Sequence, residues 1–204
     1  MMLRRLALTA LLAGAALSAS AADKSIYVVK LLNFSCSICR ASEIQDETIR
    51  QAAKATGGQF VYAPMPSEVG TYAREKVYYA SRMQGPTAEA KVRAALYRGA
   101  QDMELPLSDM SQVIEWLKDE IGPGIVDWAK LRQDASGPEA EAALSRAAGV
   151  AVRSGAQALP SYVLIEDNEP VATLDTTNMS KGSSLLALRD EVVSRINQIA
   201  KGKK

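Results

Sequence analysis

Hydrophobic and polar positions follow two periods along this chain, and the changes of period divide it into strands and helices. A nearly continuous apolar run over residues 25–34 predicts a buried strand. Residues 36 to about 56 then carry apolar side chains at helical spacing, and Gly57-Gly58 marks the helix end. The positions that show this spacing are Ile38, Ala41, Ile44, Thr48 and Ala52. Residues 59–63 form a second apolar run, ended by Pro64, so the pattern predicts a βαβ unit with a parallel strand pair.

Helical spacing dominates from residue 69 to about residue 152. The clearest stripe follows a capping residue, Ser108 or Asp109, and stops at Gly122-Pro123-Gly124. The stripes consist of Val69, Ala73, Val77, Ala80 and Met83, then Val92, Ala95, Leu96, Gly99 and Met103, then Met110, Val113, Ile114, Leu117 and Ile121. An alanine-rich helix over residues 139–152 ends this region. We interpret the stripes, with Trp116 and Trp128, as core packing.

Strand periodicity returns after the helices. Residues 161–165 and 171–174 are apolar runs separated by a polar turn, which predicts a hairpin. An amphipathic helix ends the chain, with Leu185, Leu188, Val192, Ile196 and Ile199 on one face. The order β-α-β, helical insertion, β-β-α predicts an α/β fold in which residues 22–66 and 157–204 form one domain and residues 67–156 an inserted helical domain.

The first 21 residues have the pattern of a signal peptide. Arg4 and Arg5 precede an apolar stretch too short to span a bilayer, and small residues follow up to Ala21. We expect cleavage near Ala21/Ala22 and an exported, soluble mature chain. Removing both arginines changes the formal charge from +1 to −1. A nearly neutral protein lacks the basic surface that nucleic-acid binding requires, so no nucleic-acid partner is predicted.

The candidate chemistry lies in the two cysteines, Cys36 and Cys39, which open the helix after the first strand. A helix N-terminus stabilises a thiolate at the first cysteine, and the second can resolve a mixed disulfide. A disulfide that closes so short a ring removes little chain entropy, which disfavours a purely structural role. The chain has no histidine and no further cysteine, which disfavours a zinc site and excludes Ser-His-Asp and Cys-His catalysis. We predict neither a metal nor an organic cofactor.

Taken together, the CxxC at the start of the first helix, an insertion of about 90 residues and Pro160 immediately before the third strand resemble a thioredoxin-like fold with a large helical insertion. More specifically, the chain is similar to the DsbA-like family of exported bacterial thiol-disulfide oxidoreductases. The resemblance implies that Cys36 is the nucleophile and Cys39 the resolving thiol. It also implies that Pro160 is a cis-proline beside the disulfide and that the backbone at Leu159 binds extended substrate.

The chain departs from the family pattern at the dipeptide between the cysteines and in the first strand. The family carries proline and histidine where this chain has Ser37 and Ile38, the pair expected to tune the redox potential. Lys30 occupies the position, six residues before the first cysteine, where thioredoxin-fold enzymes usually carry a buried acid. Two interpretations of Lys30 remain open: the side chain snorkels to the surface, or it is a buried cation that lowers the thiol pKa.

The expected function is disulfide exchange with protein or peptide thiols in the periplasm, with oxidation as the net direction. We expect a monomer, which as an oxidase would need a membrane redox partner to re-oxidise it. Two alternatives remain open: a disulfide reductase or isomerase, and a non-enzymatic peptide-binding chaperone or assembly factor on the same fold.

Overall fold

The computed structural model describes residues 25–66, 72–178 and 184–202. The predicted signal peptide and Val69 lie outside these residues. Within the described ranges no helix combines the length and apolar character needed to cross a membrane.

Four strands form one mixed sheet in the order β2-β1-β3-β4. The strands are β1 (Tyr27–Leu32), β2 (Phe60–Pro64), β3 (Ser161–Glu166) and β4 (Glu169–Leu174). β1 pairs with β2 in parallel and with β3 antiparallel, and β3 and β4 form an antiparallel hairpin. Helix α1 (Ser37–Ala55) connects β1 to β2. The predicted βαβ unit and the predicted hairpin are therefore confirmed.

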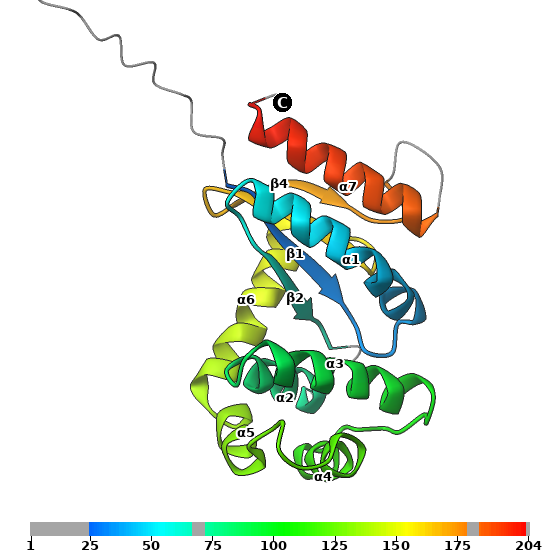
Figure 1. Ribbon diagram of the computed structural model, residues 1–204, viewed down its shortest axis with the longest axis vertical. Coiled ribbons are helices and arrows are strands. Elements are labelled where there is room, and N and C mark those ends of the chain that lie inside the picture. The colour runs from blue at the N-terminus through cyan, green and yellow to red at the C-terminus, as the bar shows by residue number, and fades with distance from the viewer. Residues whose placement is uncertain (1–24, 67–71, 179–183, 203–204) are drawn as a thin grey trace, which may run out of the picture.

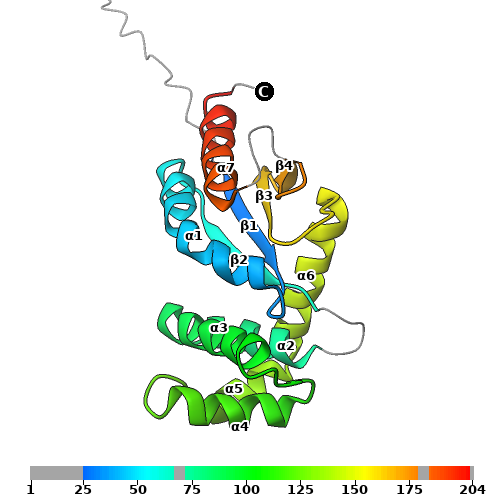
Figure 2. The ribbon, with the colours of Figure 1, turned by 90° about the vertical axis from the view of Figure 1, so that its right-hand side faces the viewer.

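Helices cover both faces of this sheet. α1 packs beside α7 (Leu185–Ala200) on one face, and α6 (Pro138–Ser154) crosses the other (Figure 2). Because β1 is central and covered on both sides, five of its six residues are buried. A strand in that position has to be apolar on both faces, which explains the nearly continuous apolar run in the sequence.

The remaining helices gather beyond the ends toward which β1 and β2 point (Figure 1). They are α2 (Ala73–Arg82), α3 (Pro86–Gln101), α4 (Met110–Ile121) and α5 (Trp128–Ala135). Asp109 is the N-cap of α4, where its side chain accepts hydrogen bonds from the amides of Ser111 and Gln112. Most of the predicted stripes are buried, although Met83 and Met103 are exposed. Trp116 and Trp128 pack against the core as expected.

Helix α1 forms where it was predicted, but its buried face was predicted wrongly. Ile44 is 82% exposed and Ile38 is 48% exposed. The residues that face the sheet are Cys39, Ser42, Asp46, Ile49 and Ala53. The physical reason is that Asp46 meets Lys30 and Tyr162 beneath the helix, while the hydroxyl of Ser42 donates to the carbonyl of Cys39 within it, so both polar side chains are buried with hydrogen-bond partners.

Side chains occupy the outer edge of β2, the first strand of the sheet. The carbonyl of Phe60 accepts a hydrogen bond from Arg50 at 3.3 Å, and that of Tyr62 accepts one from Arg82 at 3.4 Å. A third carbonyl, that of Pro64, accepts from the hydroxyl of Tyr79 at 3.1 Å, while the proline itself has no N–H to offer. Alternate carbonyls along this edge are thus all bonded within the chain.

Candidate active site

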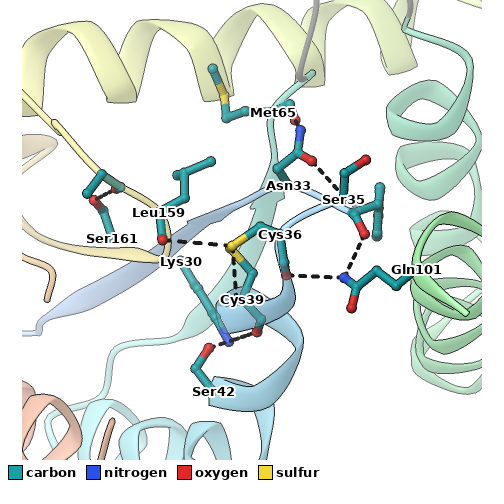
Figure 3. The surroundings of a disulfide bond; sticks show 12 residues. Lys30, Asn33, Ser35, Cys36, Cys39, Ser42, Met65, Gln101, Leu159 and Ser161 are labelled. Carbon is teal, nitrogen blue, oxygen red and sulfur yellow. Dashed lines mark hydrogen bonds between the residues drawn. A yellow bond between two sulfur atoms is a disulfide. The ribbon is translucent and has the colours of Figure 1, made fainter. Parts of the chain in front are cut away.

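The two cysteines form a disulfide at the N-terminus of α1 (Figure 3). Cys36 is the N-cap residue in an extended conformation, and its Sγ lies 3.0 Å from the backbone N–H of Cys39. Cys36 is partly exposed, whereas Cys39 is 0% exposed. The linking residues Ser37 and Ile38 are both exposed. One sulfur is therefore accessible to a second molecule and the other is not.

The loop before β3 lies directly against this disulfide. The Leu159–Pro160 peptide bond is cis, as the family resemblance predicted. The carbonyl oxygen of Leu159 is 3.8 Å from Sγ of Cys36, and Pro160 is buried. The hydroxyl of Ser161 donates a hydrogen bond to the carbonyl of Ala158 at 2.5 Å, and this bond stabilises the cis-proline loop.

Open grooves flank the disulfide on two sides. One, of about 400 Å³, is lined by Leu31, Met65, Ala158 and Leu159 among others. The second, of about 700 Å³, is lined by the residues Ser37, Ile38, Ala41, Thr176, Ser184 and Leu185. Both are mainly apolar, and each includes a residue next to the cysteines or in the cis-proline loop.

Asn33 fixes the turn that presents Cys36. Its side-chain amide donates to the carbonyl of Met65 at 2.7 Å, at the end of β2. Its Oδ1 accepts from the amide of Ser35 at 2.7 Å, and its carbonyl accepts from the amide of Cys36 at 3.1 Å. Asn33 is not among the site residues predicted from the sequence. An asparagine that follows a strand and precedes the CxxC is the available signal, because its side chain readily bonds the backbone two residues on.

Two residues at the end of α3 reach the active site from the helical region, one contacting the same turn and the other the start of α1. Gln101 donates through Nε2 to the carbonyls of Phe34 and Cys36, at 2.8 and 3.1 Å. Asp102 accepts two hydrogen bonds from the guanidinium of Arg40, at 2.6 and 3.0 Å.

The ring of Phe34 also packs against the rings of Tyr78 and Tyr97. These contacts join the active-site turn to α2 and α3, and the sequence analysis predicted none of them.

Lys30 is fully buried, so the interpretation that it snorkels to the surface is wrong. Its Nζ lies 2.6 Å from Oδ2 of Asp46 and 3.4 Å from the carbonyl oxygen of Cys39. The rings of Tyr62 and Tyr162 flank the ammonium group, at 5.6 and 5.5 Å. Burial lowers the pKa of Lys30, and the charge of Asp46 opposes that shift. The second interpretation, a buried cation beside Cys39, agrees with this position.

Asp46 was missed by the sequence analysis. It accepts a second hydrogen bond, at 2.8 Å, from the hydroxyl of Tyr162 on β3, so both carboxylate oxygens have partners. Nearer the surface, burial raises the pKa of Glu43, while the neighbouring Arg93, 2.9 Å away, opposes the shift. Lys30 stands where thioredoxin-fold enzymes usually carry a buried acid. The acid that pairs with it here is Asp46, which lies in α1, ten residues after Cys36.

Nowhere in the described ranges do three or more His, Cys, Asp and Glu side chains gather in a way that could hold a metal ion.

No protein-family model and no curated protein sequence matches the chain. Solved structures do match. The oxidoreductase NmDsbA1 from N. meningitidis superposes with a TM-score of 0.68 at 10% identity, over 90% of this chain and 88% of that one. The disulfide oxidoreductase DsbA from Proteus mirabilis gives 0.64 at 14% identity, over 90% of each chain. Pseudomonas aeruginosa DsbA gives 0.63 at 18% identity, over 87% of each chain. The chain thus has the fold of the DsbA proteins, which is a thioredoxin-like fold with a large helical insertion.

Proposed function

We propose that this protein is a thiol-disulfide oxidoreductase that exchanges disulfides with protein or peptide thiols through Cys36 and Cys39. One observation carries the proposal. Cys36, which is partly exposed, caps a helix beside a cis-proline loop, and its disulfide partner Cys39 is fully buried. Attack from solution is thereby directed to Cys36, and the helix N-terminus stabilises that sulfur as a thiolate when it leaves.

The exchange proceeds in two displacements. A substrate thiolate attacks Sγ of Cys36, the Cys36–Cys39 bond breaks, and Cys39 leaves with the electron pair and takes up a proton. The mixed disulfide joins the substrate to Cys36. Two thiolates can resolve this bond. Attack by Cys39 on Sγ of Cys36 releases the substrate thiolate and restores the protein disulfide, whereas attack by a second substrate thiolate on the substrate sulfur releases Cys36 as a thiolate. The second route completes the oxidation. The substrate has lost two electrons and gained a disulfide, and the protein has become a dithiol.

Extended peptide is the proposed substrate form. The backbone at Leu159 lies next to the reacting sulfur, and the adjoining grooves are mainly apolar. Backbone pairing beside Leu159 would supply affinity without a sequence requirement. Apolar side chains of an incompletely folded substrate would occupy the grooves, where Ile38 is exposed.

Ser37, Ile38 and Lys30 are the proposed tuning residues. No histidine stands between the cysteines to stabilise the Cys36 thiolate, and the charge of Lys30 is offset by Asp46 at 2.6 Å. The helix terminus alone contributes about 0.3–1 kcal/mol, which is less than one pKa unit. We therefore expect a potential below the roughly −120 mV of DsbA. A glutathione redox titration measures it, and a potential that high would contradict this assignment.

We place the protein in the periplasm as a monomer that oxidises its substrates and is re-oxidised by a membrane partner. The signal-peptide pattern and the fold of the DsbA proteins support this placement. Net reduction or isomerisation is the alternative direction. Peptide binding without redox chemistry is the alternative function.

A Cys36→Ser variant separates oxidoreductase from chaperone. We expect it to lose oxidation of a reduced dithiol peptide completely, while suppression of aggregation of an unfolded protein would survive only if peptide binding were the function. Cys39→Ala is the companion variant, because it should accumulate mixed disulfides at Cys36 that identify the substrates. Full activity of Cys36→Ser in a cellular complementation assay would refute the proposed chemistry.

The order of thiol reactivity is a second test. In the reduced protein we expect Cys36 to be alkylated at lower pH than Cys39, because Cys36 is partly exposed and caps α1, whereas Cys39 is buried. Quench-flow alkylation followed by peptide mass spectrometry measures both thiols across pH. Faster reaction at Cys39 would reverse the assignment of nucleophile and resolving thiol.

A further inference from the structure

Gln101 ends α3, and both hydrogen bonds from its amide nitrogen go to the backbone around the disulfide. Nε2 donates to the carbonyl of Phe34 at 2.8 Å and to that of Cys36 at 3.1 Å (Figure 3). The Cys36 carbonyl also accepts the first helical bond of α1, from the amide of Arg40 at 3.2 Å. A side chain 65 residues further along the chain thus fixes the residue that caps the active-site helix.

The neighbouring ion pair between Arg40 and Asp102 also joins α1 to the end of α3, but it is less able than Gln101 to fix the conformation of the active-site turn. Its side chains are 40% and 47% exposed, and exposed pairs contribute little because water and salt screen them. Gln101 is only partly exposed and acts on backbone groups directly. Of the two contacts, the amide is the one able to determine the conformation of the turn.

We propose that Gln101 is a positioning residue for the Cys36 thiolate, an inference that rests on the proposed oxidoreductase function. In the reduced protein, Sγ of Cys36 can accept a hydrogen bond from the backbone N–H of Cys39 only while Cys36 keeps its extended N-cap conformation. Gln101 restrains the carbonyls of Phe34 and Cys36, which bracket the turn. It also directs the positive end of its amide dipole toward that turn. Both effects favour the charged form of Cys36.

A consequence for redox behaviour follows, because a stabilised thiolate stabilises the reduced protein and makes its disulfide a stronger oxidant. The helical region would then act on the chemistry through one side chain, in addition to shaping the surface around it. Gln101 itself touches neither substrate nor sulfur in this scheme.

The test replaces Gln101 by methionine, which keeps the length of the side chain and removes both donated hydrogen bonds. Gln84 provides a matched control, since its side chain also makes two backbone bonds, to the carbonyl and amide of Asp127 at 2.9 and 2.8 Å. We expect Gln101→Met to raise the Cys36 pKa by about half a unit to one unit. The equilibrium constant for reduction by glutathione should fall by roughly three- to tenfold. Gln84→Met should change neither quantity.

Gln101→Asn is the second variant, so that the proposal remains testable if the methionine variant folds poorly. Its amide is one methylene shorter and cannot reach both carbonyls, so we expect a smaller shift in the same direction. Unchanged Cys36 pKa and unchanged glutathione equilibrium in the folded Gln101 variants would overturn the inference, even if their stability fell. Absence of any thiol exchange by the wild type would instead refute the proposed function.

Discussion

Replacing Lys30 by methionine would break a fully buried ion pair while preserving the volume of the side chain. The ammonium of Lys30 and the carboxylate of Asp46 are 2.6 Å apart, and the two side chains are 0% and 2% exposed. After the substitution, Asp46 keeps the hydroxyl of Tyr162 as a hydrogen-bond donor but loses its cation. The variant therefore leaves an anion in the interior between α1 and the sheet.

The expected loss of unfolding free energy is about 3–5 kcal/mol, because removing one partner of a buried pair leaves an uncompensated charge. Neutralising both partners should cost much less. In Lys30→Met/Asp46→Asn the amide oxygen can still accept from Tyr162, so we expect the double variant to recover most of the loss.

Urea unfolding of the oxidised proteins, followed by circular dichroism, measures these differences. Lys118→Met is the control, because Lys118 pairs with Glu115 at 2.9 Å on the surface, with side chains 36% and 60% exposed. It should cost less than about 1 kcal/mol. A Lys30→Met loss as small as that of the control, or a double variant no more stable than the single one, would refute the reasoning.

Glu75 is fully buried, neither carboxylate oxygen has a hydrogen-bond partner, and burial raises its pKa. Because the folded pKa of Glu75 lies above the roughly 4.3 of the unfolded chain, stability is lost as pH rises from the unfolded toward the folded pKa; Glu75→Gln should remove this dependence, which urea unfolding at several pH values measures. Gly58→Ala should abolish soluble folded protein, because the added Cβ would lie 1.9 Å from the carbonyl oxygen of Ile26. Gly149→Ala within α6 should instead raise stability by about 0.5–1 kcal/mol, because alanine favours a helix interior more than glycine does. Asp109→Ala should cost about 1 kcal/mol in thermal or urea unfolding through loss of the α4 cap, and a neutral result would show that the cap bonds are replaced by water.

The order of the elements could be predicted from the sequence because strand and helix periods are local properties. β1 appears as a nearly continuous apolar run, interrupted by Lys30, because it is covered on both faces, and α4 is bounded by an aspartate cap and a Gly-Pro-Gly stop. The placement of the CxxC at a helix N-terminus follows from the same local signals. The cis bond before Pro160 was predicted from the family resemblance, since the dipeptide itself carries little information.

The contacts around the cysteines could not be predicted in this way, because they join residues far apart in the chain. The buried face of α1 is decided by Lys30 beneath it, which favours a face bearing Ser42 and Asp46 over one bearing Ile38 and Ile44. A rule that places apolar residues inside chooses the wrong face when the interior contains an ion pair. Gln101 gives no local signal either, since a glutamine at the end of a helix is usually solvated.

The bonded outer edge of β2 limits how this protein can associate with other extended chains. A free edge strand offers a row of backbone groups to any unfolded polypeptide, and a protein that handles such polypeptides meets them constantly. Here Arg50, Arg82 and Tyr79 already occupy three alternate carbonyls, and Pro64 offers no donor. A chain that adds to β2 therefore finds these three acceptors already bonded within the protein, which disfavours strand addition at this edge and favours the proposed binding of extended substrate beside the disulfide.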